Sequence, residues 1–300
     1  MLSIIKRLLL ISVLLFTVCE KENNDDGIEL DTDQLIEDLR ILSSDDMEGR
    51  ATGTEGGEKA RQYILQRIQE EGALPFKGSF THPFTFSSSR TDKTNGVNVI
   101  STIEGQTDSV IVISAHYDHL GIKNGEIYNG ADDNASGTAA LFTLMDYFSR
   151  NKPKHTLVFA AFDAEEVGLK GAYAFVEDSV FLKSVTMNVN MDMVAQNAKS
   201  GLYACGTYHF PELKPILESI DTGDQTLLFG HDEPNNGQDD WSYASDHGAF
   251  LSKGKKFIYF GVEDHEYYHQ PTDEFGTIPQ DFYKGAVKLI LNAVLALDKN

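Results

Sequence analysis

The sequence has few cysteines, few basic residues and only a short N-terminal apolar run. Cys19 and Cys205 are the only cysteines among 300 residues, so a framework of intrachain disulfides is excluded. Acidic residues number 46 against 25 Lys and Arg, a formal charge of -21. Such a surface repels nucleic acid, so we expect no nucleic-acid partner. The apolar run from Leu8 to Val18 is too short for a spanning helix.

The N-terminus is typical of an exported protein. Two basic residues precede the apolar run in "MLSIIKRLLLISVLLFTVC", which predicts a signal peptide over residues 1–18. The segment resembles the signals of bacterial lipoproteins, whose mature N-terminal cysteine is lipidated. The resemblance implies membrane anchoring through Cys19, on the periplasmic side or at the cell surface, with residues 19–30 as an acidic tether. Val18 stands where such signals usually carry Gly, Ala or Ser, so simple secretion and an uncleaved anchor stay open.

The remainder of the chain, residues 31–300, alternates strand and helix patterns and is predicted to be one domain. Helical periodicity occurs over 31–44, from an N-cap at Thr54 to residue 68, and over 137–150, 168–178 and 279–297. Apolar or β-branched runs predict strands over 97–105, 109–115, 155–162, 184–192, 201–206 and 256–261. Because 109–115 is apolar throughout, we expect a central strand covered on both faces. The pattern predicts an α/β fold, a three-layer αβα sandwich around a mixed, mostly parallel sheet. Within it, Cys205 is interpreted as a small buried apolar residue.

Acidic and imidazole side chains follow these strands one after another, where the ligand crevice of such sheets lies. They are His116, Asp118 and His119; Asp132 and Asp133; Asp163, Glu165 and Glu166; Asp192; and His269. Each segment alone is weakly informative, since similar residues serve as turns, caps or hydrogen-bonded structural groups. Together, carboxylates crowded into one cleft repel each other unless cations neutralise them. A pair of divalent ions, zinc first and manganese or cobalt as alternatives, would suit this donor set.

Five of these segments resemble one known family, the two-metal (co-catalytic zinc) aminopeptidases. Its superfamily also contains glutamate carboxypeptidase and glutaminyl cyclase. The motifs "SAHYDHLG", "NGADDNASG", "FDAEEVGLKGA", "NMDM" and "YHQPTDE" occur in the family's order. The resemblance runs from about residue 42 to residue 275, and it implies a zinc-exopeptidase fold for residues 31–300.

The resemblance also implies a role for each motif residue. His116 and Asp192 would hold one metal ion, Glu166 and His269 the other, and Asp133 would bridge both, with the Asp133–Asn134 peptide cis. Asp118 would accept a hydrogen bond from His116 and so fix its tautomer. Glu165 would be the general base, and His119 would be structural because the family's ligand set is already full.

Four further residues are possible substrate or oxyanion contacts. Tyr268 and Tyr243 could donate to an oxyanion, although a core role suits either tyrosine equally well. Asp246 and His247 lie in "YASDHGAF", which resembles a family segment lining the substrate cleft but carries Gly248-Ala249 where a proline is common. The other histidines have no motif support; they are His82, His155, His209, His231 and His265.

The implied activity is metal-dependent hydrolysis of N-terminal peptide bonds in peptides with a free N-terminus. Two zinc ions would activate the water and Glu165 would move the proton. Carboxypeptidase or dipeptidase action and glutaminyl cyclisation on the same fold are the enzymatic alternatives. A surface lipoprotein that keeps the fold as a binding module is the alternative from another class. The sequence leaves side-chain specificity, native metal and oligomeric state open.

Overall fold

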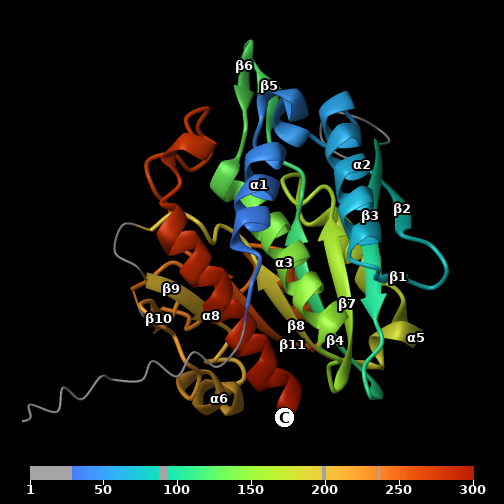
Figure 1. Cartoon of the computed structure of the whole chain (residues 1–300), viewed down its shortest axis with the longest axis vertical. Coiled ribbons are helices and arrows are strands. Elements are labelled where there is room, and N and C mark those ends of the chain that lie inside the picture. The colour runs from blue at the N-terminus through green and yellow to red at the C-terminus, as the bar shows by residue number, and fades with distance from the viewer. Residues whose placement is uncertain (1–28, 88–93, 198–200, 236) are drawn as a thin grey trace, which may run out of the picture.

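The structure is a computed structural model that describes residues 29–87, 94–197, 201–235 and 237–300. The predicted signal peptide and Cys19 lie outside these residues. Within them, nine strands form one large sheet, with helices on both faces (Figure 1). The predicted α/β architecture is thereby confirmed.

The sheet is mixed, with a parallel centre. Its strand order is β1 (Leu74–Pro75), β3 (Thr94–Ile103), β7 (His155–Phe162), β4 (Thr107–His116), β8 (Val185–Met191), β11 (Lys256–Gly261), β9 (Gly201–Cys205) and β10 (Thr226–Phe229), and β2 (Thr81–Phe86) also pairs with β3. The four central strands β7, β4, β8 and β11 run parallel. β3 and β9 join this centre antiparallel from the two sides. The carboxyl ends of the central strands therefore lie along one edge.

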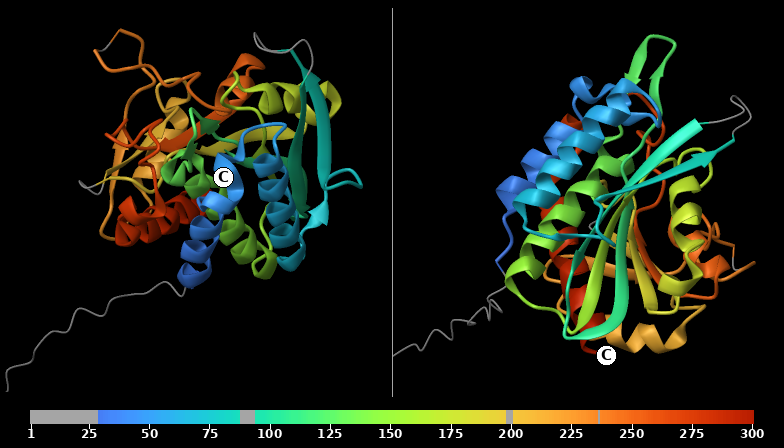
Figure 2. Two further views of the ribbon diagram at one scale, coloured as in Figure 1. Left: turned by 90° about the horizontal axis from the view of Figure 1, so that it is seen from above. Right: turned by 90° about the vertical axis from the view of Figure 1, so that its right-hand side faces the viewer.

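Helices cover the two faces of this sheet, as the right-hand view of Figure 2 shows. One face carries the longer helices α1 (Thr32–Leu42), α2 (Glu55–Glu70), α3 (Gly137–Arg150) and α8 (Gln280–Lys299). The other carries α4 (Lys170–Val176), α5 (Ser179–Leu182) and α7 (His247–Ser252). The short helix α6 (Lys214–Glu218) packs beside α8.

The middle of strand β4, Val110 to Ile113, shows why this stretch is apolar at successive positions. Ile111 and Ile113 are buried in the core beneath α1, α2, α3 and α8. Val110 and Val112 point to the opposite side, into the core beneath α4 and α7. Successive strand residues face opposite sides of a sheet, so a strand covered on both faces needs apolar residues at every position. The expectation of a doubly covered central strand is confirmed.

Helix α2 begins where its sequence predicts. Thr54 has extended backbone angles, and its hydroxyl oxygen accepts a hydrogen bond from the amide of Gly57 at 3.2 Å. This is the N-cap interaction that satisfies one of the free amides of a first turn. The 3-10 segment η1 (Asp45–Arg50) precedes this cap in the chain.

Several short elements have no clear signal in the sequence. They include the edge strand β2, strand β10, helix α7 and the hairpin of β5 (Gly121–Lys123) and β6 (Glu126–Tyr128). Each is at most six residues long, too short for periodicity to reveal. Cys205 is fully buried, as predicted. Among the described residues, no helix is both long enough and apolar enough to cross a membrane.

Candidate functional site

A cleft of about 380 Å³ opens at the carboxyl ends of the central strands. Its lining includes carboxylates and imidazoles that the sequence places far apart, namely His116, Asp133, Glu165, Glu166, Asp192 and His269. β4 supplies the first, the π-helical segment η2 (Ala131–Ser136) the second, and the loops after β7, β8 and β11 the others. All six residues predicted as metal ligands or general base therefore meet in one place.

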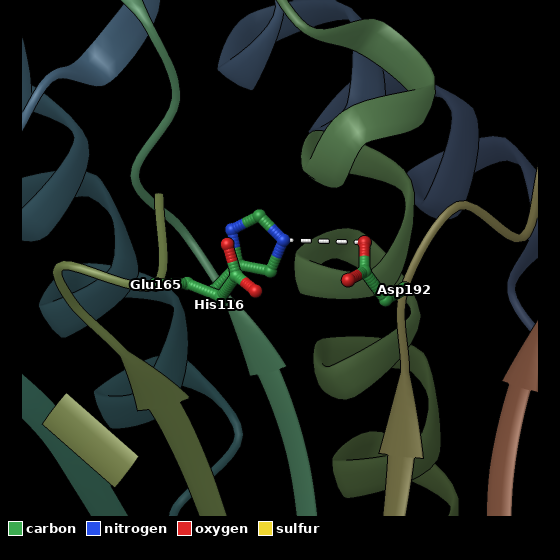
Figure 3. A group of neighbouring side chains, drawn as sticks. All are labelled: His116, Glu165 and Asp192. Carbon is green, nitrogen blue, oxygen red and sulfur yellow. Dashed lines mark hydrogen bonds and ion pairs between the residues drawn. The ribbon is translucent and has the colours of Figure 1, made fainter. Parts of the chain in front are cut away.

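His116 is oriented by the main chain. Its Nδ1 lies 3.0 Å from the carbonyl oxygen of Asp118, and because a carbonyl can only accept, Nδ1 carries the proton. Nε2 then faces carboxylates, 3.2 Å from Asp192 Oδ1 and 3.4 Å from Asp133 Oδ1. Figure 3 shows His116 between Asp192 and Glu165. The ligand atoms of His116, Glu165 and Asp192 lie within 4.8 Å of one another, close enough to share a cation.

A second group of potential ligands lies beside the first. His269 Nε2 is 3.2 Å from Asp133 Oδ2 and 3.5 Å from Glu166 Oε2. His119 approaches the same two carboxylates, with Nδ1 2.8 Å from Glu166 Oε1 and 3.6 Å from Asp133 Oδ2. Asp133 thus faces both groups, as a bridging carboxylate must.

The expected hydrogen bond from His116 to Asp118 is present, and the atom that accepts it is the main-chain carbonyl rather than the carboxylate. The ring donates to the main-chain carbonyl of Asp118, and the nearest carboxylate oxygen is 3.7 Å away. The carboxylate instead accepts from the amides of Glu165 at 3.0 Å and Glu166 at 3.3 Å. Asp118 therefore orients both the histidine and the two glutamates, the first through its carbonyl and the others through its side chain.

Asp133 is held from behind by Asp273. The carboxylate of Asp273 accepts hydrogen bonds from the amides of Asp132 and Asp133 at 3.0–3.1 Å. The Asp133–Asn134 peptide is cis, as expected from the family resemblance. Asp132 is fully buried and points away from the cleft, where it accepts from the amide of Ala195 and contacts His265 Nε2 at 2.9 Å. Asp132 is thus structural, and its neighbour alone reaches the cleft.

Asp163 is likewise excluded as a ligand by its partners. Its carboxylate accepts from the amide of Val97 at 2.8 Å and the hydroxyl of Thr52 at 2.7 Å. These bonds tie the end of β7 to β3 and to the turn after η1. Asp163 is buried and absent from the cleft lining, so it braces the loop that carries the two glutamates.

Arg50 is a supporting residue that the sequence analysis missed. Its guanidinium is fully buried and donates to four main-chain carbonyls, at 2.6–2.9 Å, those of Leu42, Tyr117, Asn129 and Gly130. Two of these carbonyls adjoin the segments that carry Asp118 and Asp133. A lone arginine in a turn-rich stretch carries no sequence signal for such a role, because three of its four partners lie 67–80 residues away in the chain.

Burial and mutual repulsion shape the charges of the site. Burial raises the pKa of Glu165 well above its ordinary value; nearby His116 opposes this, while Asp192 and Asp246 add to it. Burial alone would lower the pKa of His116, but the carboxylates of Asp192 and Glu165 raise it well above the usual range. Despite burial, the surrounding imidazoles of His119, His269 and His116 lower the pKa of Asp133. The carboxylates and imidazoles thus share protons when no cation is bound.

The donor atoms fit bound metal ions. Within the described chain, Nδ1 of His119 and Oε1 of Glu166 are buried and lie 2.8 Å from each other, and Nε2 of His119 has no hydrogen-bond partner. Buried polar atoms are nearly always paired, so such incompletely paired donor atoms beside a cleft carboxylate indicate an absent partner. Imidazole nitrogen and carboxylate oxygen are common ligands of zinc. The residues present therefore suit divalent cations, zinc above all.

The four predicted substrate contacts fall into two pairs. Tyr243 and Tyr268 line the cleft; Tyr243 is 58% exposed, and the Tyr268 ring stacks on His269 with centroids 4.0 Å apart. Asp246 and His247 are fully buried and do not line it. The His247 ring stacks against Phe257 and Tyr259, and its Nε2 donates to the Trp241 carbonyl at 2.8 Å.

The expectation that Asp246 or His247 contacts substrate directly is therefore wrong, because both side chains are buried and neither lines the cleft. Burial raises the pKa of Asp246 to about 7, with His116 opposing and Asp192 adding to the shift. Both carboxylate oxygens of Asp246 lack a hydrogen-bond partner within the described residues. Burial lowers the pKa of His247 to about 3, so this imidazole is neutral.

Apolar and aromatic residues form the rest of the wall, and the sequence analysis named none of them as site residues. They are Leu169, Met193, Trp241, Tyr259 and Val262. The Tyr259 hydroxyl also donates to the main-chain carbonyl of Asp192 at 3.3 Å. Leu169, Met193 and Val262 follow strands and Trp241 lies in the 230–245 loop, so their sequence positions could place them near the site. The direction in which their side chains point, however, depends on tertiary packing.

Comparisons with known proteins agree with this geometry. Leucine aminopeptidase 1 of Ajellomyces capsulatus (strain NAm1 / WU24) is 30% identical over 173 residues, which cover 54% of this chain and 40% of that protein. A vacuolar membrane protease of Kluyveromyces lactis is 27% identical over 164 residues, 49% of this chain and 17% of the relative. The chain therefore matches less than half the length of these curated relatives.

Solved structures share the fold at low sequence identity. A zinc aminopeptidase from Bacillus subtilis superposes with a TM-score of 0.68 at 16% identity, covering 89% of this chain and 95% of that one. A glutaminyl cyclase from Fimbriiglobus ruber reaches 0.75 at 17% identity, covering 90% and 96%. The sequence description of peptidase family M28 matches residues 98–294, which contain every predicted ligand. The chain belongs to peptidase family M28.

Proposed function

We propose that this protein is a metal-dependent aminopeptidase that uses two zinc ions. The observation that carries the proposal is the convergence of two ligand groups in one cleft, with Asp133 facing both. The first position would be held by His116 and Asp192, and the second by Glu166 and His269. When bound, the ions would polarise the scissile carbonyl and lower the pKa of the attacking water.

Glu165 is the general base in this proposal. Its amide is held by Asp118 Oδ1 at 3.0 Å, while its side chain lies at the cleft beside His116. The carboxylate would take a proton from the attacking water and then deliver it to the leaving amine. Because burial and neighbouring acids raise the pKa of Glu165, this side chain holds a proton more readily than an exposed glutamate does.

The charge of the cleft favours recognition of a substrate amino group. The described residues that line it include no lysine or arginine, whereas Asp264 adds a further acid to the ligand carboxylates. A carboxypeptidase needs a cationic group to bind its substrate's terminal carboxylate. A free α-ammonium, by contrast, is attracted to an acidic wall. The apolar residues Met193, Trp241 and Val262 would contact the side chain of the N-terminal residue.

Matched substitutions of the adjacent glutamates test these roles. Glu165→Gln should retain zinc and lose on the order of 10²–10⁴-fold in kcat, the usual contribution of a general base. Glu166→Gln should instead lose bound zinc. Glu177→Gln, an exposed change on a surface pair with Lys253, is the control and should leave both unchanged. Near-normal turnover in Glu165→Gln would refute the assignment of the base.

Substrates separate the aminopeptidase from its alternatives. Leucyl- and alanyl-arylamides should be cleaved, and acetylation of their α-amine should abolish cleavage. A carboxypeptidase would tolerate that block on a peptide substrate. The likeness to a glutaminyl cyclase shows the fold alone, so a glutaminyl-arylamide should be assayed for ring closure beside release. Inactivity of zinc-saturated protein on all these substrates would favour the binding-module alternative.

We further propose that Cys19 is lipidated and that residues 19–30 tether residues 31–300 as one catalytic domain. The proposal rests on the N-terminal sequence alone. Mass spectrometry of the mature protein should find a lipid-modified N-terminal cysteine, and Cys19→Ser should release the enzyme from membranes. Recovery of unmodified protein from the membrane-free fraction would contradict the tether and leave the catalytic proposal untouched.

A further inference from the structure

His119 has surroundings that a structural histidine does not. Its ring is fully buried in the loop after β4; Nε2 has no hydrogen-bond partner among the described residues, and Nδ1 lies against the carboxylates of Glu166 and Asp133. A buried imidazole that serves only the fold normally donates through one nitrogen and accepts through the other. His247, by comparison, is anchored to the main chain through one nitrogen, because its Nε2 is bonded to a carbonyl while its Nδ1 is unpaired within the described residues.

The Nδ1 atom of His119 points at the second ligand group. It lies 2.8 Å from Glu166 Oε1 and 3.6 Å from Asp133 Oδ2. One ligand atom from each of these residues lies within 4.8 Å of the other two. Gly130 makes room for the ring, because a Cβ there would come within 2.5 Å of His119.

Two imidazoles therefore face the same pair of carboxylates from different sides. The His119 side chain is 0% exposed, whereas that of His269 is 40% exposed. Their rings are 6.0 Å apart and tilted by 53°, so they do not stack face to face. The buried ring is held by its surroundings, and the exposed ring lies at the cleft mouth on the loop after β11.

We propose that His119 is a zinc ligand of the second position, in addition to Glu166, Asp133 and His269. This inference rests on the proposed two-zinc function and adds a nitrogen donor to that position. The second position would then hold two imidazoles and the first position one. Since imidazole favours zinc over manganese or magnesium, the second position should be the more selective for zinc.

Zinc X-ray absorption of the zinc-saturated, full-length protein tests the proposal directly. Imidazole rings give characteristic multiple scattering, so the spectrum reports the number of histidines per zinc. Wild type should show three imidazoles shared by two ions, and His119→Gln should show two. His155→Gln is the matched control, because that imidazole pairs with Asp298 at the far end of β7 and should not change the count.

Zinc affinity supplies the second readout. Titration against a competing chelator should show that His119→Gln weakens one of the two zinc equivalents by at least about 10–100-fold. If wild type binds two zinc ions with only two imidazoles, the inference about His119 fails and the proposed function stands. Wild type that binds no zinc would refute both. The wild-type spectrum decides the question even if His119→Gln does not fold.

Discussion

Arg50 offers the most direct test of how the site is supported. The predicted perturbation is Arg50→Met, which keeps an unbranched apolar stem and removes every donor of the guanidinium. Four buried carbonyls would lose their partner, those of Leu42, Tyr117, Asn129 and Gly130. None of them belongs to a neighbouring residue of Arg50, so no local rearrangement can replace all four bonds.

The magnitude follows from these four bonds. Each buried acceptor left unpaired costs about 1–3 kcal/mol, so the gross loss is about 4–12 kcal/mol. Part of this free energy is recovered, because Arg50→Met removes a buried charge. Burial disfavours that charge, as the lowering of the Arg50 pKa to about 10 indicates. We expect a net loss of about 3–5 kcal/mol in the free energy of unfolding, a large share of the 5–15 kcal/mol typical of a domain.

Urea unfolding of the zinc-saturated protein measures this loss. Arg50→Met should lower the midpoint without changing the slope. Arg40→Met is the control, because Arg40 is an exposed arginine on a surface pair with Glu37 and its loss should cost less than about 1 kcal/mol. Arg50→Lys should recover little, since one ammonium cannot reach four carbonyls arranged for a planar fork. Full recovery of stability by lysine would show that the charge at residue 50, rather than its hydrogen bonds, stabilises the fold. A loss below about 1 kcal/mol in Arg50→Met would refute the claim that the four bonds support the site.

Three further outcomes are expected. Gly49→Ala should destabilise the fold by about 1–3 kcal/mol in thermal unfolding, because φ is +65° and a Cβ would lie 2.4 Å from the Tyr128 carbonyl oxygen; an unchanged midpoint would contradict this. In a Cys19→Ser background, Cys205 should react with a thiol reagent only after unfolding, because its side chain is inaccessible in the folded protein and burial raises the pKa of its thiol. Fast reaction of the native protein would contradict this burial. In zinc-free protein, burial raises the pKa of Asp246 to about 7, whereas in the unfolded chain this pKa is about 4. The folded protein therefore binds the proton more tightly, and the free energy of unfolding should fall as the pH rises from about 4 to about 7. Asp246→Asn should flatten that slope in melting curves, and an equal slope in both proteins would refute it.

Features that depend on neighbouring residues along the chain could be predicted from the sequence. Apolar runs predict β4, β7, β8 and β11, and the Thr54 cap predicts the start of α2. Because parallel strands end on one edge of a sheet, residues directly behind those strands had to converge. That is why the six predicted ligand and base residues line one cleft.

Features that depend on where a side chain points in space could not be predicted from the sequence. Arg50 bonds to carbonyls up to 80 residues away, and nothing adjacent in the sequence signals this. His247 follows Asp246 in a promising motif, yet its ring turns into the aromatic core. His119 was interpreted as structural because the family's ligand set was full; our proposal that it binds zinc rests instead on the carboxylates of Glu166 and Asp133 that its Nδ1 meets in space.

The adjacency of Glu165 and Glu166 has a physical explanation in the arrangement around them. The carboxylate of Asp118 accepts from both glutamate amides, one on each oxygen, which fixes the backbone between them. With the backbone fixed, the two side chains diverge: Glu165 joins His116 in the first ligand group, and Glu166 joins Asp133 in the second. Asp118 uses both oxygens on the main chain, so it does not compete with the glutamates for a cation. A single turn of backbone thereby directs Glu166 to the second position and the proposed base Glu165 to the side of His116, and the repulsion between the neighbouring acids is reduced because each faces imidazole.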